Sequence, residues 1–332
     1  MKNRARPASA AAALAVAAVV VLGAEGTARA ATAACTAADI TARESECPPG
    51  AGLPCRIRGD YDVLQPSCTF DFGERAVTIA AGSIIDAGDR IVNFVAGSFR
   101  VEGLGRIRAR GTATTPGGLV SIRTSGDVVV DPVGVIDVTN AEDAGQVEVD
   151  AGGSVRIDGR IDAYGTTTES GAGFVTLFAG GDIRIAGTLD LRNGSVSFSP
   201  GEAILDARGE VDLGGTIDLA GADGGTLEVL ADGAIEVLTD IDADATGDAG
   251  SGGSIQLDSG RGVRVAGRLF ARGSPGIGQS GGDGGSITIE ARFGDLQVDA
   301  NILASGAAAD GSGDEVLLTA RGSVTIAAGT TV

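Results

Sequence analysis

The chain has 332 residues, 55 of them glycine, and 25 basic and 44 acidic residues give it a formal net charge of −19. The glycines follow no Gly-X-Y period, which excludes collagen, and regularly alternating Val, Ile, Leu and Ala residues argue against disorder. The acidity argues against a nucleic-acid partner, and the absence of histidine excludes Ser-His-Asp and Cys-His catalysis and histidine-bound zinc.

Residues 1–30 have the pattern of a secretory signal peptide. A basic start is followed by an apolar run at residues 10–23 and by a small-residue cleavage site at residues 28–30. The alternative is an uncleaved membrane anchor, but the apolar run is short for a spanning helix. Cleavage would remove four basic residues and one acidic residue, and would leave a mature chain of charge −22 with no lysine. We expect that mature chain to be exported and to have no membrane span.

Residues 31–75 contain no repeat and hold all four cysteines, Cys35, Cys47, Cys55 and Cys68. An even number of cysteines in an exported segment predicts two disulfides, and the sequence leaves all three pairings open. A metal site is the alternative, although C-x-x-C spacing and histidine are both missing. We expect this segment to be a disulfide-bearing N-terminal cap on the first coil of a repeat.

Repetition begins weakly near Ala76 and is regular from Gly118 onward. Gly145–Gly165 shows the unit, in which three short runs of alternating aliphatic and polar residues are separated by glycines. Successive copies start about 24 to 32 residues apart, which is typical of repeat architectures. Residues 76–332 are therefore predicted to form an all-β fold, a single-stranded right-handed parallel β-helix (solenoid) of about nine coils, with the hand set by parallel crossovers.

Stacking identical coils would place equivalent aliphatic side chains in interior columns. We expect the turn glycines to be required for positive φ or tight bends, and the long loops after the third strand to lie on one side of the rod. The three predicted columns are Val147, Val175, Ala203, Leu227, Ile255, Ile287 and Val316; Val155, Ile183, Val211, Ile235, Val263, Leu296 and Val324; and Ile136, Ile161, Leu189, Ile217, Ile241, Leu269 and Ile302.

One row of aspartates stands out as a candidate site. The row follows the third-strand aliphatic residue in five consecutive coils and ends where the next coils have Phe270 and Leu303. These carboxylates should point outward and stack, so they form either a cation site, for which Ca²⁺ is the best candidate, or a solvated negative stripe. The solvated stripe is the favoured interpretation. We expect neighbouring arginines such as Arg156, Arg160 and Arg184 to reduce the repulsion between the carboxylates, and some of the carboxylate pKa values to be raised. The five residues are Asp137, Asp162, Asp190, Asp218 and Asp242.

Other acidic and aromatic residues are given structural roles. Aspartates in the glycine-rich loops match no calcium-binding motif and are explained by turn chemistry. Four phenylalanines are interpreted as core or core-edge residues, since aromatic residues are too sparse for a sugar-stacking platform. The loop aspartates are Asp143, Asp223, Asp248, Asp283 and Asp310, and the phenylalanines are Phe94, Phe99, Phe174 and Phe178.

The frame GGxIxIxAxGDIxIxGxIDAxG resembles that of exported bacterial right-handed parallel β-helix proteins, namely filamentous-haemagglutinin-like surface proteins and pectin-lyase-like chains. The resemblance covers residues 76–332 and rests on core aliphatic residues and turn glycines. It implies a secreted or surface-displayed protein of the periplasm, cell surface or extracellular space, often adhesive or carbohydrate-directed.

Two functional hypotheses follow. The first is a structural or adhesive surface protein without catalytic residues or a bound cofactor, whose partner is an extracellular polysaccharide or another surface protein. The second is a polysaccharide lyase or glycoside hydrolase on the same scaffold, with calcium as its candidate cofactor. Because the last coil is unfinished, we also expect either a longer rod or end-to-end self-association.

Overall fold

The computed structural model describes residues 32–332 apart from residue 51 and residues 195–199, 278–280 and 308–309. The chain divides into two units, Met1–Ala30 and Ala31–Val332. The predicted signal peptide, residues 1–30, lies outside the described residues.

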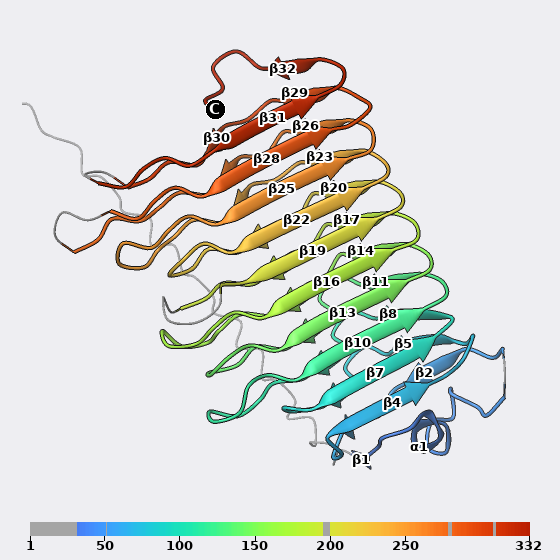
Figure 1. Ribbon diagram of the computed structural model, residues 1–332. Coiled ribbons are helices and arrows are strands. Elements are labelled where there is room, and N and C mark those ends of the chain that lie inside the picture. Colours follow the sequence, from blue (N-terminus) through green and yellow to red (C-terminus); the bar gives the residue numbers. More distant parts are fainter. Residues whose placement is uncertain (1–31, 51, 195–199, 278–280, 308–309) are drawn as a thin grey trace, which may run out of the picture. The chain divides into compact units, whose positions relative to one another are not determined.

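The second unit is a parallel β-solenoid of about ten coils, and each regular coil contributes one strand to each of three sheets (Figure 1). In sequence order, the strands of sheet B are β4 (Ser67–Asp71), β7 (Ile91–Ala96), β10 (Leu119–Thr124), β13 (Gln146–Ala151), β16 (Phe174–Ala179), β19 (Glu202–Ala207), β22 (Thr226–Ala231), β25 (Ser254–Ser259), β28 (Ser286–Ala291) and β31 (Val316–Ala320).

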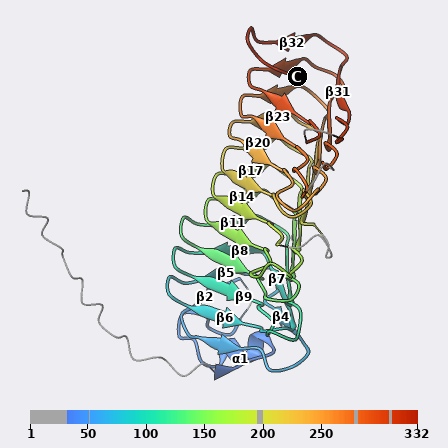
Figure 2. The same cartoon turned by 90° about the vertical axis from the view of Figure 1, so that its left-hand side faces the viewer.

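Sheets A and C consist of shorter strands. Sheet A contains β1 (Thr32–Ala33), β3 (Tyr61–Asp62), β6 (Ile84–Asp86), β9 (Arg106–Arg108), β12 (Val135–Asp137), β15 (Arg160–Asp162), β18 (Thr188–Asp190), β21 (Thr216–Asp218), β24 (Ile241–Asp242), β27 (Leu269–Phe270) and β30 (Ile302–Leu303). Sheet C, whose strands are stacked one above the next in Figure 2, contains β2 (Cys55–Ile57), β5 (Ala76–Ile79), β8 (Ser98–Val101), β11 (Val128–Val130), β14 (Val155–Ile157), β17 (Ile183–Ile185), β20 (Val211–Leu213), β23 (Ile235–Val237), β26 (Val263–Val265), β29 (Leu296–Val298) and β32 (Val324–Ile326).

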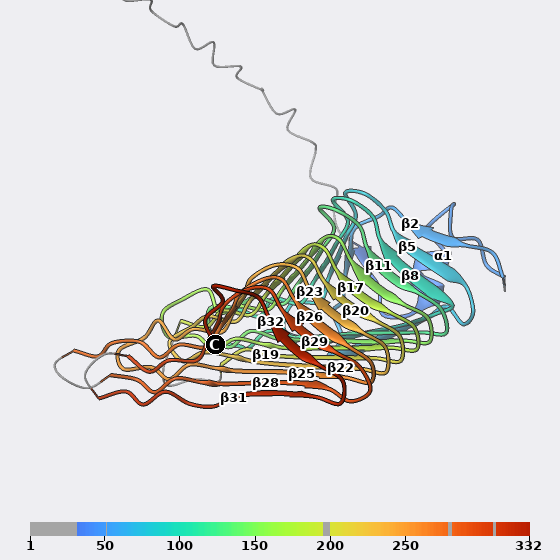
Figure 3. The same cartoon turned by 90° about the horizontal axis from the view of Figure 1, so that it is seen from above.

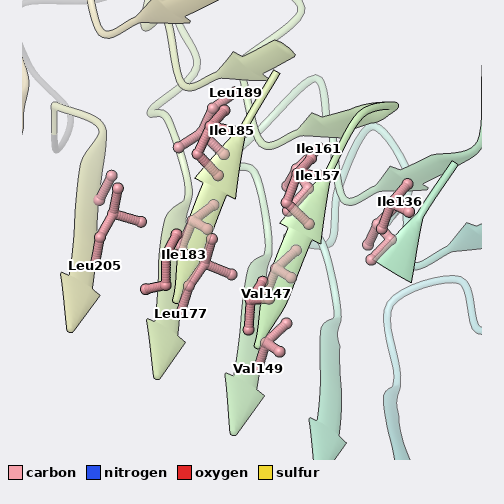
Figure 4. Packing of buried hydrophobic residues seen from close by; sticks show 14 of the residues in the cluster. Ile136, Val147, Val149, Ile157, Ile161, Leu177, Ile183, Ile185, Leu189 and Leu205 are labelled. Atoms are coloured by element: carbon pink, nitrogen blue, oxygen red, sulfur yellow. The ribbon is translucent and has the colours of Figure 1, made fainter. Parts of the chain in front are cut away.

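All three predicted aliphatic columns are confirmed by the strand register. Ile136 pairs with Ile161, Ile161 with Leu189, and Leu189 with Ile217, and the other two columns pair in the same way. These residues are almost fully buried except in the last coil, and the core of the unit is one cluster. Figure 4 shows part of this cluster at close range. Each inward-facing aliphatic side chain therefore packs on its equivalents in the coils above and below.

The turn glycines of the regular coils have a role beyond the two that were expected. Among the described glycines, positive φ occurs near the N-terminal end and at Gly329, so of the two expected reasons, positive φ or a tight bend, the first does not apply to the regular coils. Seven glycines instead form a column directly before successive sheet B strands: Gly118, Gly145, Gly173, Gly201, Gly225, Gly253 and Gly285. A Cβ atom on five of them would overlap the carbonyl oxygen of the glycine one coil earlier. Close approach of stacked backbones therefore requires glycine there.

The N-terminal end of the solenoid is closed by a short helix, α1 (Ala37–Thr41). A reciprocal capping box between Thr36 and Asp39 begins this helix, and Ile40 is fully buried in the core cluster. The two predicted disulfides are present as Cys35–Cys68 and Cys47–Cys55. They tie the segment around α1 to β4 and β2, which already pair in register with the regular coils although they precede Ala76.

The loops between sheet A and sheet B project at one edge of the solenoid, as expected from their variable length (Figure 3). At the other end of the core, inward positions of the last coil are uncovered. Val324 and Ile326 on β32 have exposed fractions of 45% and 46%. Their equivalents in β29 are fully buried, because β32 lies over them.

Candidate functional site

The predicted aspartate row stacks in register on the outer side of sheet A. Asp137 pairs with Asp162, Asp162 with Asp190, Asp190 with Asp218 and Asp218 with Asp242, and the row ends at Phe270 and Leu303 as predicted. The prediction that these aspartates form a solvated stripe is wrong. Asp137, Asp162 and Asp190 have exposed fractions of 2%, 8% and 4%, and the other two are half-buried.

Arginine side chains cover the row, which is the physical reason for its burial. Arg160 forms salt bridges with Asp162 and Asp190, and Arg192 with Asp190 and Asp218. The Arg192 guanidinium donates to both carboxylate oxygens of Asp190 at 2.8 Å. Long arginine stems can cover a neighbouring side chain while the guanidinium stays partly in water.

Two of the arginines expected to neutralise the row lie elsewhere, and two that do contact it, Arg110 and Arg192, were not predicted. Arg156 pairs with Asp158, and Arg184 pairs with Asp212, so neither neutralises the row. Arg110, from the preceding coil, forms the salt bridge to Asp137. In the described part of the chain, no three His, Cys, Asp or Glu residues gather as a metal site would require. Guanidinium groups lie at salt-bridge distance from four of the five aspartates, Asp137, Asp162, Asp190 and Asp218.

Burial also shifts the acidity of the row. Desolvation raises the pKa of Asp162, Asp218 and Asp242 above the ordinary value of 3.8. Like charges add to this effect, from stacked aspartates for the first two residues and from aspartates of the same coil for Asp242. For Asp162, the hydrogen bond from Arg160 opposes the shift. The expectation that some of these pKa values are raised is confirmed.

We expect Asp218→Asn to stabilise the protein at neutral pH by roughly 1 kcal/mol, because it removes a like charge from a stack with about 4.8 Å spacing. The asparagine oxygen can still accept the hydrogen bond from the Ala220 amide. A raised folded-state pKa means that the wild type loses stability as pH rises from 3.8 through that pKa. Urea unfolding of both proteins should therefore differ at neutral pH and converge below the unfolded pKa.

Asp240→Asn is the control of opposite sign. Its carboxylate has a lowered pKa, chiefly because Arg268 donates a hydrogen bond to it, so its loss should destabilise the protein at neutral pH. Equal effects of the two substitutions would contradict the inference that the charge of Asp218 destabilises the folded protein and the charge of Asp240 stabilises it.

The loop aspartates connect successive coils. Asp143 accepts a hydrogen bond from the Gly171 amide at 3.2 Å, and Asp223 accepts one from the Ser251 amide at 2.9 Å. Asp283 and Asp248 accept from Ser312 and Ile277 in the same way, and Asp310 is exposed. Four of the five thus satisfy a backbone donor of the next coil rather than of their own turn.

The outer face of sheet B carries a feature that the sequence interpretation missed. Phe94 and Phe99 belong to the core as expected, with ring centroids 4.9 Å apart. Phe174 and Phe178 do not, because the inward positions of β16 belong to other residues: Phe174 is half-buried and Phe178 is 44% exposed. Strict alternation from the buried column residue Val175 places both on the outer face, so the register itself was the usable signal.

Three hollows lie in line around these two phenylalanines. The central hollow, about 390 Å³, has Phe174, Thr176 and Phe178 along one strand. The loop-side hollow, about 490 Å³, adjoins Phe174, and the far hollow, about 270 Å³, adjoins Phe178. Together they run along β16, and six-residue pairing of β16 with β13 and β19 fixes their shape.

Acidic residues predominate around the hollows. The carboxylates are Asp143, Glu148, Asp150, Glu202 and Asp206, and the cations are Arg123 and Arg208. Arg123 and Asp150 are 3.3 Å apart, and their side chains are 69% and 60% exposed. This ion pair contributes little to stability and can exchange for other partners.

Comparison with known proteins assigns no family. No family model, curated protein or solved structure matches this chain. No helix among the described residues has the length and apolarity needed to span a membrane. The two disulfides are compatible with an oxidising periplasmic or extracellular location.

Proposed function

We propose that this chain is an exported, non-catalytic β-solenoid of a bacterial cell surface, which adheres through the outer face of sheet B to an extracellular polysaccharide or another surface protein. The observation that carries the proposal is the pair of outward-facing residues Phe174, which is half-buried, and Phe178, which is exposed. The paired strands hold both beside three aligned hollows. A preformed concave surface with aromatic residues is typical of binding sites.

The charged groups of the molecule agree with a binding role. The carboxyls with raised pKa values, Asp162, Asp218 and Asp242, lie on sheet A and line none of the three hollows. Two of them are covered by Arg160 or Arg192 at salt-bridge distance. A general acid for glycoside cleavage would need a raised pKa beside the bound sugar.

A polysaccharide hydrolase or lyase is the second candidate, and the far hollow favours it. Asp150 and Asp206 line this hollow on either side of Phe178, from strands two spacings apart, or about 10 Å. Inverting glycosidases separate their carboxyl groups by up to about 9.5 Å. Arg208 lines the same hollow and could bind an acidic substrate.

A panel of acidic and neutral polysaccharides, with and without Ca²⁺, distinguishes the two functions. We expect the disulfide-bonded protein to bind at least one polymer and to release no shortened or unsaturated products. Product release that Asp206→Asn abolishes would replace the adhesive function by the enzymatic one. Binding that Ca²⁺ does not alter would argue against a calcium-dependent site.

A further inference from the structure

The central hollow owes its shape to the order of side chains on β16. Phe174, Thr176 and Phe178 occupy successive outward positions, so the two aromatic side chains rise about 13 Å apart along the strand. Thr176 between them is short and only 5% exposed, and it forms the floor. Each phenylalanine also borders the next hollow, which makes three consecutive recesses along one strand.

The charges around the recesses favour a cationic occupant. Exposed Glu148 and Asp150 border the central hollow on one side, and Asp206 borders the far hollow. Arg123 is the counter-charge in the central hollow, but its exposed ion pair with Asp150 is weak. Aromatic rings attract cations through their faces, and neighbouring carboxylates add Coulomb attraction. An ammonium group beside Phe178 would gain both, because Asp150 lies opposite Phe178 on the neighbouring strand.

The form of the surface distinguishes a polymer from a folded protein. Phe178 is the one large hydrophobic residue exposed on the sheet B strands from β10 to β28. A stable protein interface buries about 800 Å² on each partner around a desolvated apolar centre, which one side chain does not supply. Recesses in a line instead fit a narrow chain with repeating rings.

We propose that the three hollows bind a linear polysaccharide whose sugar rings carry protonated amino groups. The rings stack against Phe174 and Phe178, and the amino groups face Glu148 and Asp150. This inference rests on the proposed function, because it names the partner of the same face.

The test is calorimetric titration of the purified, disulfide-bonded protein with β-linked glucosamine oligomers in mildly acidic buffer of low ionic strength. N-acetylglucosamine oligomers have the same backbone without the charge, and galacturonic acid oligomers reverse it. We expect glucosamine oligomers to bind about tenfold more tightly than their acetylated counterparts, the factor that one cation–π contact supplies. Galacturonic acid oligomers should bind least.

Matched variants separate this site from general electrostatic attraction. Phe178→Ser should weaken glucosamine binding about tenfold. Phe293→Ser, at a phenylalanine that is 70% exposed outside the hollows, should leave it unchanged. Asp150→Asn should weaken binding, whereas Glu228→Gln on the more distant strand β22 should not.

Equal binding of the charged and acetylated oligomers would overturn the inference, as would equal losses in the Phe178 and Phe293 variants. Tighter binding of an oligolysine peptide that is insensitive to Phe178→Ser would also overturn it. If the oligomers fail to bind while a polymer of the wider panel binds without turnover, the amino-sugar inference fails and the adhesive function stands. Cleavage of a bound oligomer would instead overturn the non-catalytic function.

Discussion

Gly253→Ala should destabilise the protein by about 3 kcal/mol or more, because the new methyl group would overlap the carbonyl oxygen of Gly225 in the preceding coil. Removing this overlap would require the two coils to separate at this corner. The Gly253 amide also donates a hydrogen bond to the Ala243 carbonyl oxygen there, at 2.8 Å. The midpoint of urea-induced unfolding, followed by far-ultraviolet circular dichroism, measures the loss.

Gly214→Ala is the matched control. Gly214 lies in the corner between β20 and β21, and a Cβ atom there would meet nothing closer than the Asp212 carboxylate at 3.5 Å. Its φ is not in the left-handed region, so alanine fits the folded backbone. Alanine should stabilise the protein by about 0.5 kcal/mol, because it lowers the conformational entropy of the unfolded chain. Similar losses at both glycines would show that flexibility, and not close approach, selects glycine.

Arg192→Ala should cost about 2 kcal/mol, because the side chain of Asp190 is only 5% exposed and would lose two hydrogen bonds to its carboxylate. The value lies below the range for breaking a buried pair because Arg160 stays 3.3 Å from the same carboxylate. Stacking of the Arg192 guanidinium over Tyr164, at 5.3 Å, would also be lost. Equilibrium unfolding in urea at neutral pH measures the change.

Two further variants identify the cause. Asp190→Asn in the Arg192→Ala background should recover much of the loss, because the uncompensated charge is removed. Arg184→Ala breaks a salt bridge of 3.6 Å between more exposed groups and should cost less than about 1 kcal/mol. If Arg184 and Arg192 contributed equally, burial of the aspartate row would not be the source of the effect.

The solenoid could be predicted because its core depends on two local rules. Ile161, Leu189 and Ile217 follow glycine corners at matching distances, and alternation decides which side of each strand faces inward. The first coil was harder, since β2–β4 lack the regular spacing of aliphatic residues and glycines and are tied down by the Cys35–Cys68 and Cys47–Cys55 disulfides.

The candidate sites show what register alone leaves open. Alternation shows that Asp190 points away from the core, but its burial depends on where the long side chains of Arg160 and Arg192 turn. Phe178 could have been placed on the outer face from the position of Val175, although the general preference of phenylalanine for cores suggested otherwise. The central hollow depends further on short Thr176 and on side chains contributed by neighbouring coils.

The repeated pairing of identical columns also limits how such a chain can lengthen. Insertion of a single residue within β16 would exchange its inner and outer faces, whereas duplication of one whole coil would give every new strand two partners like those it already has. Genetic growth of this architecture should therefore proceed in whole units, with smaller length changes confined to the protruding edge between sheets A and B.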